Sequence, residues 1–276
     1  MMEKSTIDVE KAINFIREKG KPIDKLKLSL MLNENSDTLE KLAEYLNIQN
    51  SDGGIPFRMR EGSISTIGPT ITFFKDFLIL NKQEIVKEFL EKGVNFILEN
   101  QHDNGFFEEP ISIKNFDYSP WETPGTEPNR IYCTSIVLNF LLGVDEQRYN
   151  NIINKCIDYL SRKWRYDTGF KSYPHALWNA IPSFVKIKGM EDSISKRGLE
   201  MLQTFQLDSY PSSSLVWMIE SFINVGLENH SCVEKVVKVL EQRQVSNGWW
   251  SSEDGEEYDS STTLSVLYVL NRLGYI

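Results

Sequence analysis

The sequence predicts an all-α protein, an (α/α)6 toroid of about six helix pairs arranged as an inner and an outer ring of helices. Three observations favour this fold: four stretches with one internal spacing, a helical apolar pattern before each of them, and few strand patterns. Repeats at a fixed spacing decide the fold, because each copy buries its apolar face against the next copy. We expect a single domain over 1–276, with clear repeats over 36–276 and a less typical helix pair over 1–35.

The four stretches each predict one helix of about four turns. Each begins 16 residues before a glycine, and apolar residues at helical spacing fill the interval. A proline or a small polar residue near the start suits a helix N-terminus, and a following glycine accepts the left-handed conformation that ends many helices. The glycines expected to end these helices are Gly143, Gly189, Gly226 and Gly274.

A second helix is expected before each stretch, because apolar residues recur there at i, i+3 and i+4. These predicted helices cover 87–101, 151–164, 193–206 and 231–244. Two earlier pairs are expected at 38–49 with 64–80 and at 7–20 with 24–34. Six consecutive pairs can close into a ring, and the long connection near 101–129 is a place where function is often found.

The loops contain a second repeated motif, Gln-x-x-x-Gly, usually followed by large apolar residues. It occurs at Gln49–Gly53, Gln101–Gly105 and Gln244–Gly248, with a degenerate copy around Gly169. The glycine and the residues before it favour a turn. We predict a structural role, in which the glutamine bonds exposed backbone carbonyls and the aromatic side chain packs back over the helices.

Composition narrows the function classes. The net charge is −9, from 30 basic and 39 acidic residues, and this balance disfavours a broad surface for nucleic acid or anionic membrane. The sequence contains no run of about 18 apolar residues, so we expect no transmembrane helix. The first residues lack the apolar stretch of a signal peptide. Three widely spaced cysteines support no disulfide framework, so we expect a cytoplasmic protein.

The complete motif Gln244-Val245-Ser246-Asn247-Gly248-Trp249-Trp250 resembles the QW motif of squalene and terpene cyclases, and similar repeats occur in protein prenyltransferase β subunits. The resemblance covers about residues 36–276. It implies a toroid with a central, aromatic-lined cavity that handles isoprenoid chains. The function it implies is a terpene cyclase-like enzyme, a lyase or isomerase, that cyclises a small apolar substrate by acid-initiated or cation chemistry.

The resemblance also suggests catalytic residues. Such cyclases protonate their substrate with an acid of an Asp-x-Asp-Asp motif, which is absent here, and the nearest counterpart is Glu257-Tyr258-Asp259-Ser260. Asp259 is then the candidate acid and Glu257 the residue that tunes it. The alternative is that Asp259 caps a helix, since a carboxylate is stabilised at a helix N-terminus.

His175 is a further candidate acid or base, because it is the histidine at the start of a predicted inner helix; the alternative is a packed or capping residue. Aromatic side chains could line the substrate cavity through their quadrupoles, although helix aromatics are often core residues. The candidates for substrate binding are Trp121, Tyr132, Tyr173, Trp178, Tyr210, Trp217 and Tyr258.

Two further functions stay open. One is a non-catalytic toroid that binds a ligand or a partner, and the other is a prenyltransferase β-subunit-like protein with a degenerate zinc site and a second subunit. We expect no cofactor and no metal; the weak alternative is a metal site at Cys133 and Asp259. We expect no nucleic-acid partner, and peripheral membrane contact stays open.

The loops also hold many carboxylates, and a converging pair would suit glycoside hydrolysis. We expect most of them to be solvated. They are Glu108, Glu109, Asp117, Glu122, Glu127, Glu253, Asp254 and Glu256.

Overall fold

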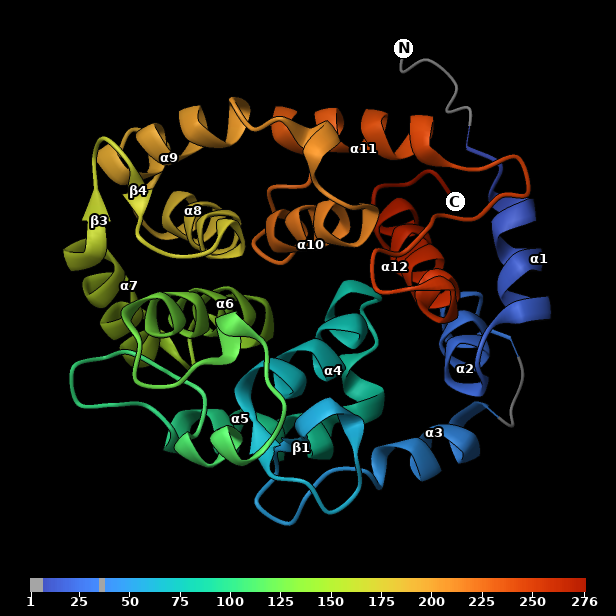
Figure 1. Cartoon of the computed structure of the whole chain (residues 1–276), viewed down its shortest axis with the longest axis horizontal. Helices are drawn as coiled ribbons and strands as arrows, with labels where there is room; N and C mark the ends of the chain where they lie inside the picture. The colour runs from blue at the N-terminus through green and yellow to red at the C-terminus, as the bar shows by residue number, and fades with distance from the viewer. Residues whose placement is uncertain (1–6, 35–37) are drawn as a thin grey trace. The chain divides into compact units, whose positions relative to one another are not determined.

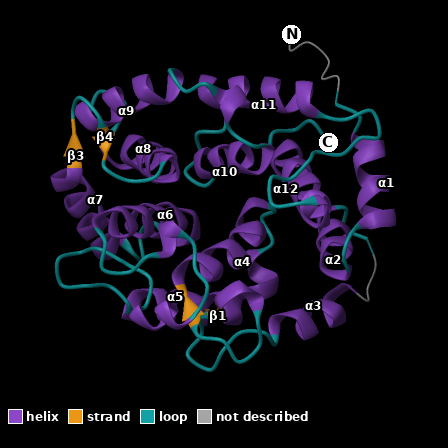
Figure 2. Ribbon diagram, viewed as in Figure 1, coloured by secondary structure: helices purple, strands orange, loops and turns teal. Residues whose placement is uncertain are grey.

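The computed structural model describes residues 7–34 and 38–276, and helices dominate it (Figure 1, Figure 2). The chain divides into two compact units. Unit 1 comprises Met1–Leu46, Gln206–Ile223 and Glu228–Ile276, and unit 2 comprises Asn47–Phe205 and Asn224–Leu227. The expectation of a single domain over 1–276 stays a prediction.

Unit 2 contains three largely buried helices, α4, α6 and α8, and three helices that pack against them, α5, α7 and α9. Within this unit α6 packs on α4, α7 and α8, while α5 packs on α4 and α9 on α8 (Figure 1). The α-helices are α4 (Ile67–Ile79), α5 (Lys87–Glu99), α6 (Glu127–Asp145), α7 (Asn150–Lys163), α8 (Pro174–Lys188) and α9 (Ser193–Gln203). Short 3-10 turns lie at η1 (Phe57–Met59), η2 (Gln83–Val86), η3 (Ile111–Asn115) and η4 (Pro120–Glu122).

Unit 1 repeats this arrangement. Here α12 packs on α1, α2 and α10, and α11 packs on α10. The α-helices are α1 (Val9–Lys19), α2 (Pro22–Met31), α3 (Thr38–Leu46), α10 (Ser212–Ile223), α11 (Ser231–Arg243) and α12 (Asp259–Arg272). Two further 3-10 turns are η5 (Leu207–Ser209) and η6 (Glu256–Tyr258).

The helices differ in how much of their surface is buried. In α6, consecutive residues from Cys133 to Leu142 are buried, so every side of this part of the helix meets protein. In α7 the buried residues fall on one stripe that includes Ile153, Ile157 and Leu160, and the other faces are polar. A helix that is apolar on all sides belongs in a core, and an amphipathic one covers it.

The predicted helices are confirmed in the described residues, each within a few residues of its expected bounds. Gly189, Gly226 and Gly274 have positive φ at or just after helix ends, as expected. The expectation for Gly143 is wrong, because α6 continues through it to Asp145. A side chain at Gly143 would lie about 3.2 Å from Asn224, so here the glycine serves close packing.

Strand structure is limited to two short antiparallel ladders in the described part of the chain. In unit 2, β1 (Ile55–Pro56) pairs with β2 (Ser65–Thr66), and β3 (Trp164–Arg165) pairs with β4 (Gly169–Phe170). Both ladders lie in the connections that lead into a buried helix, α4 or α8. Among the described helices, none is both long and apolar enough to cross a bilayer.

The Gln-x-x-x-Gly loops have the structural role that the sequence predicts. Gln244 Nε2 donates to the Gly248 carbonyl at 2.8 Å and to the Asp8 carbonyl at 3.0 Å, and its Oε1 accepts from the Asp8 amide at 2.7 Å. Gln49 Nε2 likewise donates to Gly53 and Phe89 carbonyls, at 2.7 and 2.8 Å. One side chain thus closes its own turn and ties it to a second helix.

A glycine is required in each of these turns. Gly53, Gly105 and Gly248 have φ near +90°, a region that side chains other than glycine rarely adopt. A Cβ at Gly53 would lie 2.3 Å from the Lys92 carbonyl oxygen, and one at Gly105 would lie 2.7 Å from that of Lys155. The turn therefore sits directly on the backbone of a neighbouring helix.

A threonine joins each turn to the buried helix that follows. The amide two residues after the glycine donates to a threonine Oγ1, at 2.9 Å for Ile55 to Thr70 and Phe107 to Thr134, and at 3.1 Å for Trp250 to Thr263. These threonines are 0% exposed. A buried amide without a partner destabilises the fold, so this hydrogen bond fixes the position along the helix at which the loop makes contact.

We predict that Gln244→Ala lowers the free energy of unfolding by about 2 kcal/mol, because three buried or half-buried backbone groups lose their partner. Urea denaturation followed by circular dichroism measures this loss.

The matched control is Gln101→Ala. Gln101 makes the equivalent bond to Gly105 only at 3.4 Å, so its removal should cost less than about 1 kcal/mol. Equal losses for the two variants would contradict the account of the turn.

Candidate functional site

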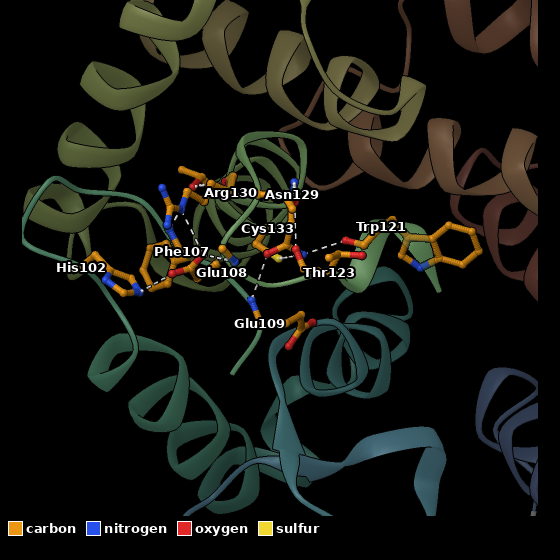
Figure 3. A network of polar contacts seen from close by, with 12 residues as sticks. His102, Phe107, Glu108, Glu109, Trp121, Thr123, Asn129, Arg130 and Cys133 are labelled. Atoms are coloured by element: carbon orange, nitrogen blue, oxygen red, sulfur yellow. Dashed lines mark hydrogen bonds and ion pairs between the residues drawn. The ribbon is translucent and has the colours of Figure 1, made fainter. Parts of the chain in front are cut away.

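The long loop before α6 brings two adjacent carboxylates into different surroundings (Figure 3). Glu108 has basic side chains as partners: its carboxylate lies 3.0 Å from Arg130 Nε and 3.4 Å from His102 Nε2. Glu109 follows it in the chain, points to the other side, and meets backbone amides instead. Neighbouring carboxylates in unlike environments can have different protonation states, as acid–base sites require.

Glu109 closes the N-terminus of α4. Its Oε2 accepts from the Ile67 amide at 2.8 Å and its Oε1 from the Gly68 amide at 2.7 Å. The first amides of a helix have no partner inside the helix, and the residue before α4, Thr66, provides no side-chain cap. Glu109 supplies that cap from 41 and 42 residues away along the chain.

The Glu109 side chain is 2% exposed, and its burial raises the pKa of the carboxyl from 4.5 to about 7. The two amide bonds oppose this shift, and the charge of Glu122 adds to it. Near neutral pH the group therefore exists in both protonated and ionised forms. Burial retains the proton, while the amides and the helix dipole can hold the negative charge once the proton has left.

Asn129 fixes the loop that presents Glu109. It is 0% exposed, and its Oδ1 accepts from the Glu109 amide at 3.3 Å. Its Nδ2 donates to the Trp121 carbonyl at 2.7 Å and contacts Cys133 Sγ at 3.5 Å. One buried amide side chain thus links the start of α6 to both arms of the loop (Figure 3).

Four of the predicted site residues come together beside this loop. The ring of Tyr132 packs edge-on against the rings of Tyr173 and His175, with 6.4 Å between the ring centres in each case. The centres of the His175 and Trp178 rings lie 4.5 Å apart. Tyr173 also donates its hydroxyl proton to the Pro120 carbonyl at 2.8 Å. The cluster belongs to α6 and α8 and to the residue just before α8.

Tyr132 of this cluster is coupled to Glu109 by electrostatic interaction. Burial is the largest cause of the raised pKa of Tyr132, and the charges of Glu109 and Glu122 raise it further. Burial also lowers the pKa of His175 to about 4, with a smaller effect from Lys75. At neutral pH the imidazole is therefore uncharged, and it can accept a proton but cannot serve as the acid.

The other predicted residues occupy different places. Trp121 lies in unit 2 and is 46% exposed. The other three lie in unit 1. The Tyr210 backbone carbonyl accepts a hydrogen bond from Arg243, and Trp217 is exposed on α10. The centre of the Tyr258 ring lies 4.4 Å from Lys21 Nζ.

Asp259 begins α12 and is 6% exposed. Its Oδ1 accepts from the Ser252 amide at 2.7 Å. Ser252 lies four residues after Gly248, as Glu109 lies four residues after Gly105, so Asp259 anchors its loop as Asn129 anchors the other. Glu257 is exposed, and the two carboxylates share a cleft of about 850 Å³ with α1.

Cys133 is fully buried, and this burial raises the pKa of its thiol well above the usual range. The residue belongs to unit 2 and Asp259 to unit 1. Within residues 7–34 and 38–276, no group of three or more His, Cys, Asp or Glu side chains is placed to hold a metal ion. A metal site at Cys133 and Asp259 stays untested.

The sequence missed Glu109 and Asn129. Of the eight loop acids, most are exposed as expected, but Glu109 is buried and Glu108 and Glu122 are half-buried. The exposed ones are Asp117, Glu127, Glu253, Asp254 and Glu256. A signal was present in the repeats: aligning Gly105 with Gly248 places Glu109 at the position of Ser252, next to the start of a buried helix. Asn129 in turn takes the role that Asp259 has in the last repeat.

No protein-family model and no curated protein matches the chain. Among the solved structures that are similar to the chain, three match over nearly the whole length of both chains. One is a protein from Actinoplanes, with 12% identity, a TM-score of 0.59 and coverage of 96% of this chain and 98% of that one. The others are two variants of the type II terpene cyclase MstE from Scytonema.

The MstE complex with merosterolic acid A, its product, has 12% identity, a TM-score of 0.59 and coverage of 97% and 96%. The complex with geranylgeranyl dihydroxybenzoate, its substrate, has 11% identity, a TM-score of 0.60 and coverage of 97% of both chains. The fold is similar to that of type II terpene cyclases. The predicted all-α class, an α/α toroid, is thereby confirmed.

We predict opposite pH effects of Glu109 and His175 on stability. From pH 4.5 to 7, folded Glu109 keeps a proton that the unfolded chain releases, so its contribution to stability falls as the pH rises. From pH 4 to 6.5, the unfolded chain protonates His175 and the folded chain does not, so that contribution rises with pH.

Urea denaturation across this range separates the two residues. In Glu109→Gln the falling contribution disappears, so the wild type should lose about 3 kcal/mol relative to the variant between pH 4.5 and 7. His175→Phe lacks the contribution that rises with pH. The free energy of unfolding of the wild type relative to this variant should therefore rise between pH 4 and 6.5. A wild-type minus Glu109→Gln difference that is constant with pH would contradict the raised pKa.

Proposed function

We propose that this chain is a terpene cyclase-like enzyme that protonates an isoprenoid-like substrate and directs the resulting cation to a cyclic product. The observation that carries the proposal is Glu109, a buried carboxyl whose pKa is raised to about 7 next to an aromatic cluster. Support at the level of fold comes from MstE, whose complexes contain geranylgeranyl dihydroxybenzoate as the substrate and merosterolic acid A as the product.

In the proposed reaction the Glu109 proton adds to one carbon of a substrate double bond and leaves a carbocation at the other. A second double bond of the chain attacks this cation, and a ring closes. Loss of a proton from a carbon next to the last cation restores a double bond. The proton gained equals the proton lost, so the product is an isomer of the substrate.

The site is suited to this step because burial weakens the hold of water on the carboxylate and favours the protonated acid, while the α4 amides partly stabilise the carboxylate left after the transfer. Ionised Glu109 keeps both amide bonds to α4, and the helix N-terminus favours its negative charge. The adjacent rings of Tyr132, Tyr173 and Trp178 can stabilise a nearby cation by their quadrupoles. His175 is neutral, so it does not repel the cation, and we assign it as the base that takes the final proton.

Asp259, with Glu257 beside it in sequence, is the competing candidate acid. The structure offers a clean test of Asp259, because Asn129 performs the same anchoring role with a neutral amide. Asp259→Asn can therefore keep the bond to the Ser252 amide while losing the proton.

We predict that purified protein converts a linear isoprenoid from a panel of diphosphates, free hydrocarbons and prenylated aromatic acids into an isomer of unchanged mass. Glu109→Gln should lower the rate by at least about a hundredfold, because the amide cannot donate the initiating proton. Asp259→Asn should keep most of the activity. Gas chromatography with mass detection follows both.

The reverse ranking, with activity lost in Asp259→Asn and kept in Glu109→Gln, would assign the acid to Asp259. No conversion by the wild type, combined with saturable binding of one compound, would favour the non-catalytic binding toroid. A cysteine peptide that gains a prenyl mass would instead favour the transferase alternative.

A further inference from the structure

A cationic cleft lies between α7 and the turn at residues 103–106, in a part of unit 2 that the proposed reaction does not use. Its volume is about 670 Å³. Four cations and two carboxylates line it, although the whole chain has a net charge of −9. The cations are Arg130, Lys155, Arg162 and Lys163, and the carboxylates are Asp103 and Asp158.

The cleft is a feature of the repeat, because unit 1 contains an equivalent one. That cleft, between α1 and residues 247–249, is lined by Lys11, Phe15 and Glu18, which correspond in spacing to Lys155, Tyr159 and Arg162. The same geometry therefore occurs with two charge patterns. The cleft in unit 1 has two cations and four carboxylates, the reverse of the cleft at α7.

Arg162 is the one of these three matched positions at which the charge changes sign. The equivalent position is Glu18 in α1 and, by the same spacing from Lys92, Glu99 in α5. A hollow between such a turn and a helix needs no cation at this position, since the cleft at α1 has Glu18 there. Arg162 is also held in place, because it donates to the Asn104 carbonyl at 3.0 Å.

Two of the four cations have no carboxylate partner. Arg130 lies 3.0 Å from Glu108, and Lys163 lies 3.5 Å from Glu127. Across the described residues no ion pair is formed by Lys155 or Arg162, although both face the same hollow. They lie on one face of α7, seven residues apart, where side chains of a helix align.

We propose that this cleft binds a diphosphate-type oxyanion, with Arg162 and Lys155 as its main ligands. The planar guanidinium can bond two phosphate oxygens at once, and the ammonium supplies a second charge. A nucleobase is not expected here: the ring of Phe106 is already stacked on His102 at 4.3 Å and lies 4.7 Å from the Arg130 guanidinium. This proposal is independent of the proposed cyclase activity.

The test is calorimetric titration of the full chain with inorganic diphosphate at low ionic strength. Arg162→Glu installs the residue that the equivalent positions of two other copies already hold, so we expect it to fold. It should weaken binding by at least about tenfold, because a charged hydrogen-bond partner is replaced by a repelling one. Arg162→Gln should weaken binding to a smaller extent.

The matched control is Lys235→Glu on α11, which changes the net charge equally at an exposed position outside the cleft. It should alter the affinity by less than about twofold, because surface charges at a distance are screened. A parallel titration with a prenyl diphosphate identifies the source of the anion. Equal affinity assigns the free anion, and tighter binding of the ester assigns a lipid-linked diphosphate.

Two results would overturn the proposal. One is the absence of saturable binding to the wild type at millimolar diphosphate. The other is an equal loss of affinity in Lys235→Glu and Arg162→Glu, which would reduce the effect to net charge.

Discussion

The hydrogen bond from a loop amide to a buried threonine is the interaction on which the rest of the structure depends. It occurs at Thr70, Thr134 and Thr263, and in each case it fixes where a glycine turn meets the following buried helix. The glutamine four residues before the glycine holds the other side of the turn. Because both ends of the turn are fixed, the residues just after it are delivered to the start of a buried helix.

At that position the repeat can place a carboxyl group at the start of a buried helix. Glu109 enters it two residues after the amide bonded to Thr134, and there it meets the free amides of α4. The same place in the last repeat holds Ser252, whose amide is taken by Asp259. One scaffold thus presents a carboxyl from the loop in one copy and from the helix in another.

The sequence predicted the helices well and the site only in part. Helices follow from apolar spacing, prolines and glycines, which are local signals; the failure at Gly143 shows that packing against Asn224 can give a glycine another purpose. Tyr132, Tyr173 and His175 were each named as candidates from the sequence, but their meeting in one cluster was not predicted. The burial of Glu109 was not predicted either, because it depends on amides 41 and 42 residues away, and no local pattern encodes that contact.

The central claim is that a large part of Glu109 stays protonated near neutral pH inside the folded chain. A carbon-13 NMR titration of the glutamate carboxyls, with the Glu109 signal identified by its loss in Glu109→Gln, measures this property directly. The account predicts that this one signal titrates with an apparent pKa near 7, well above the usual value for glutamate. A Glu109 signal that titrates near 4.5 or below would contradict it, because the amides of α4 would then hold a permanent carboxylate and the group could not serve as an acid.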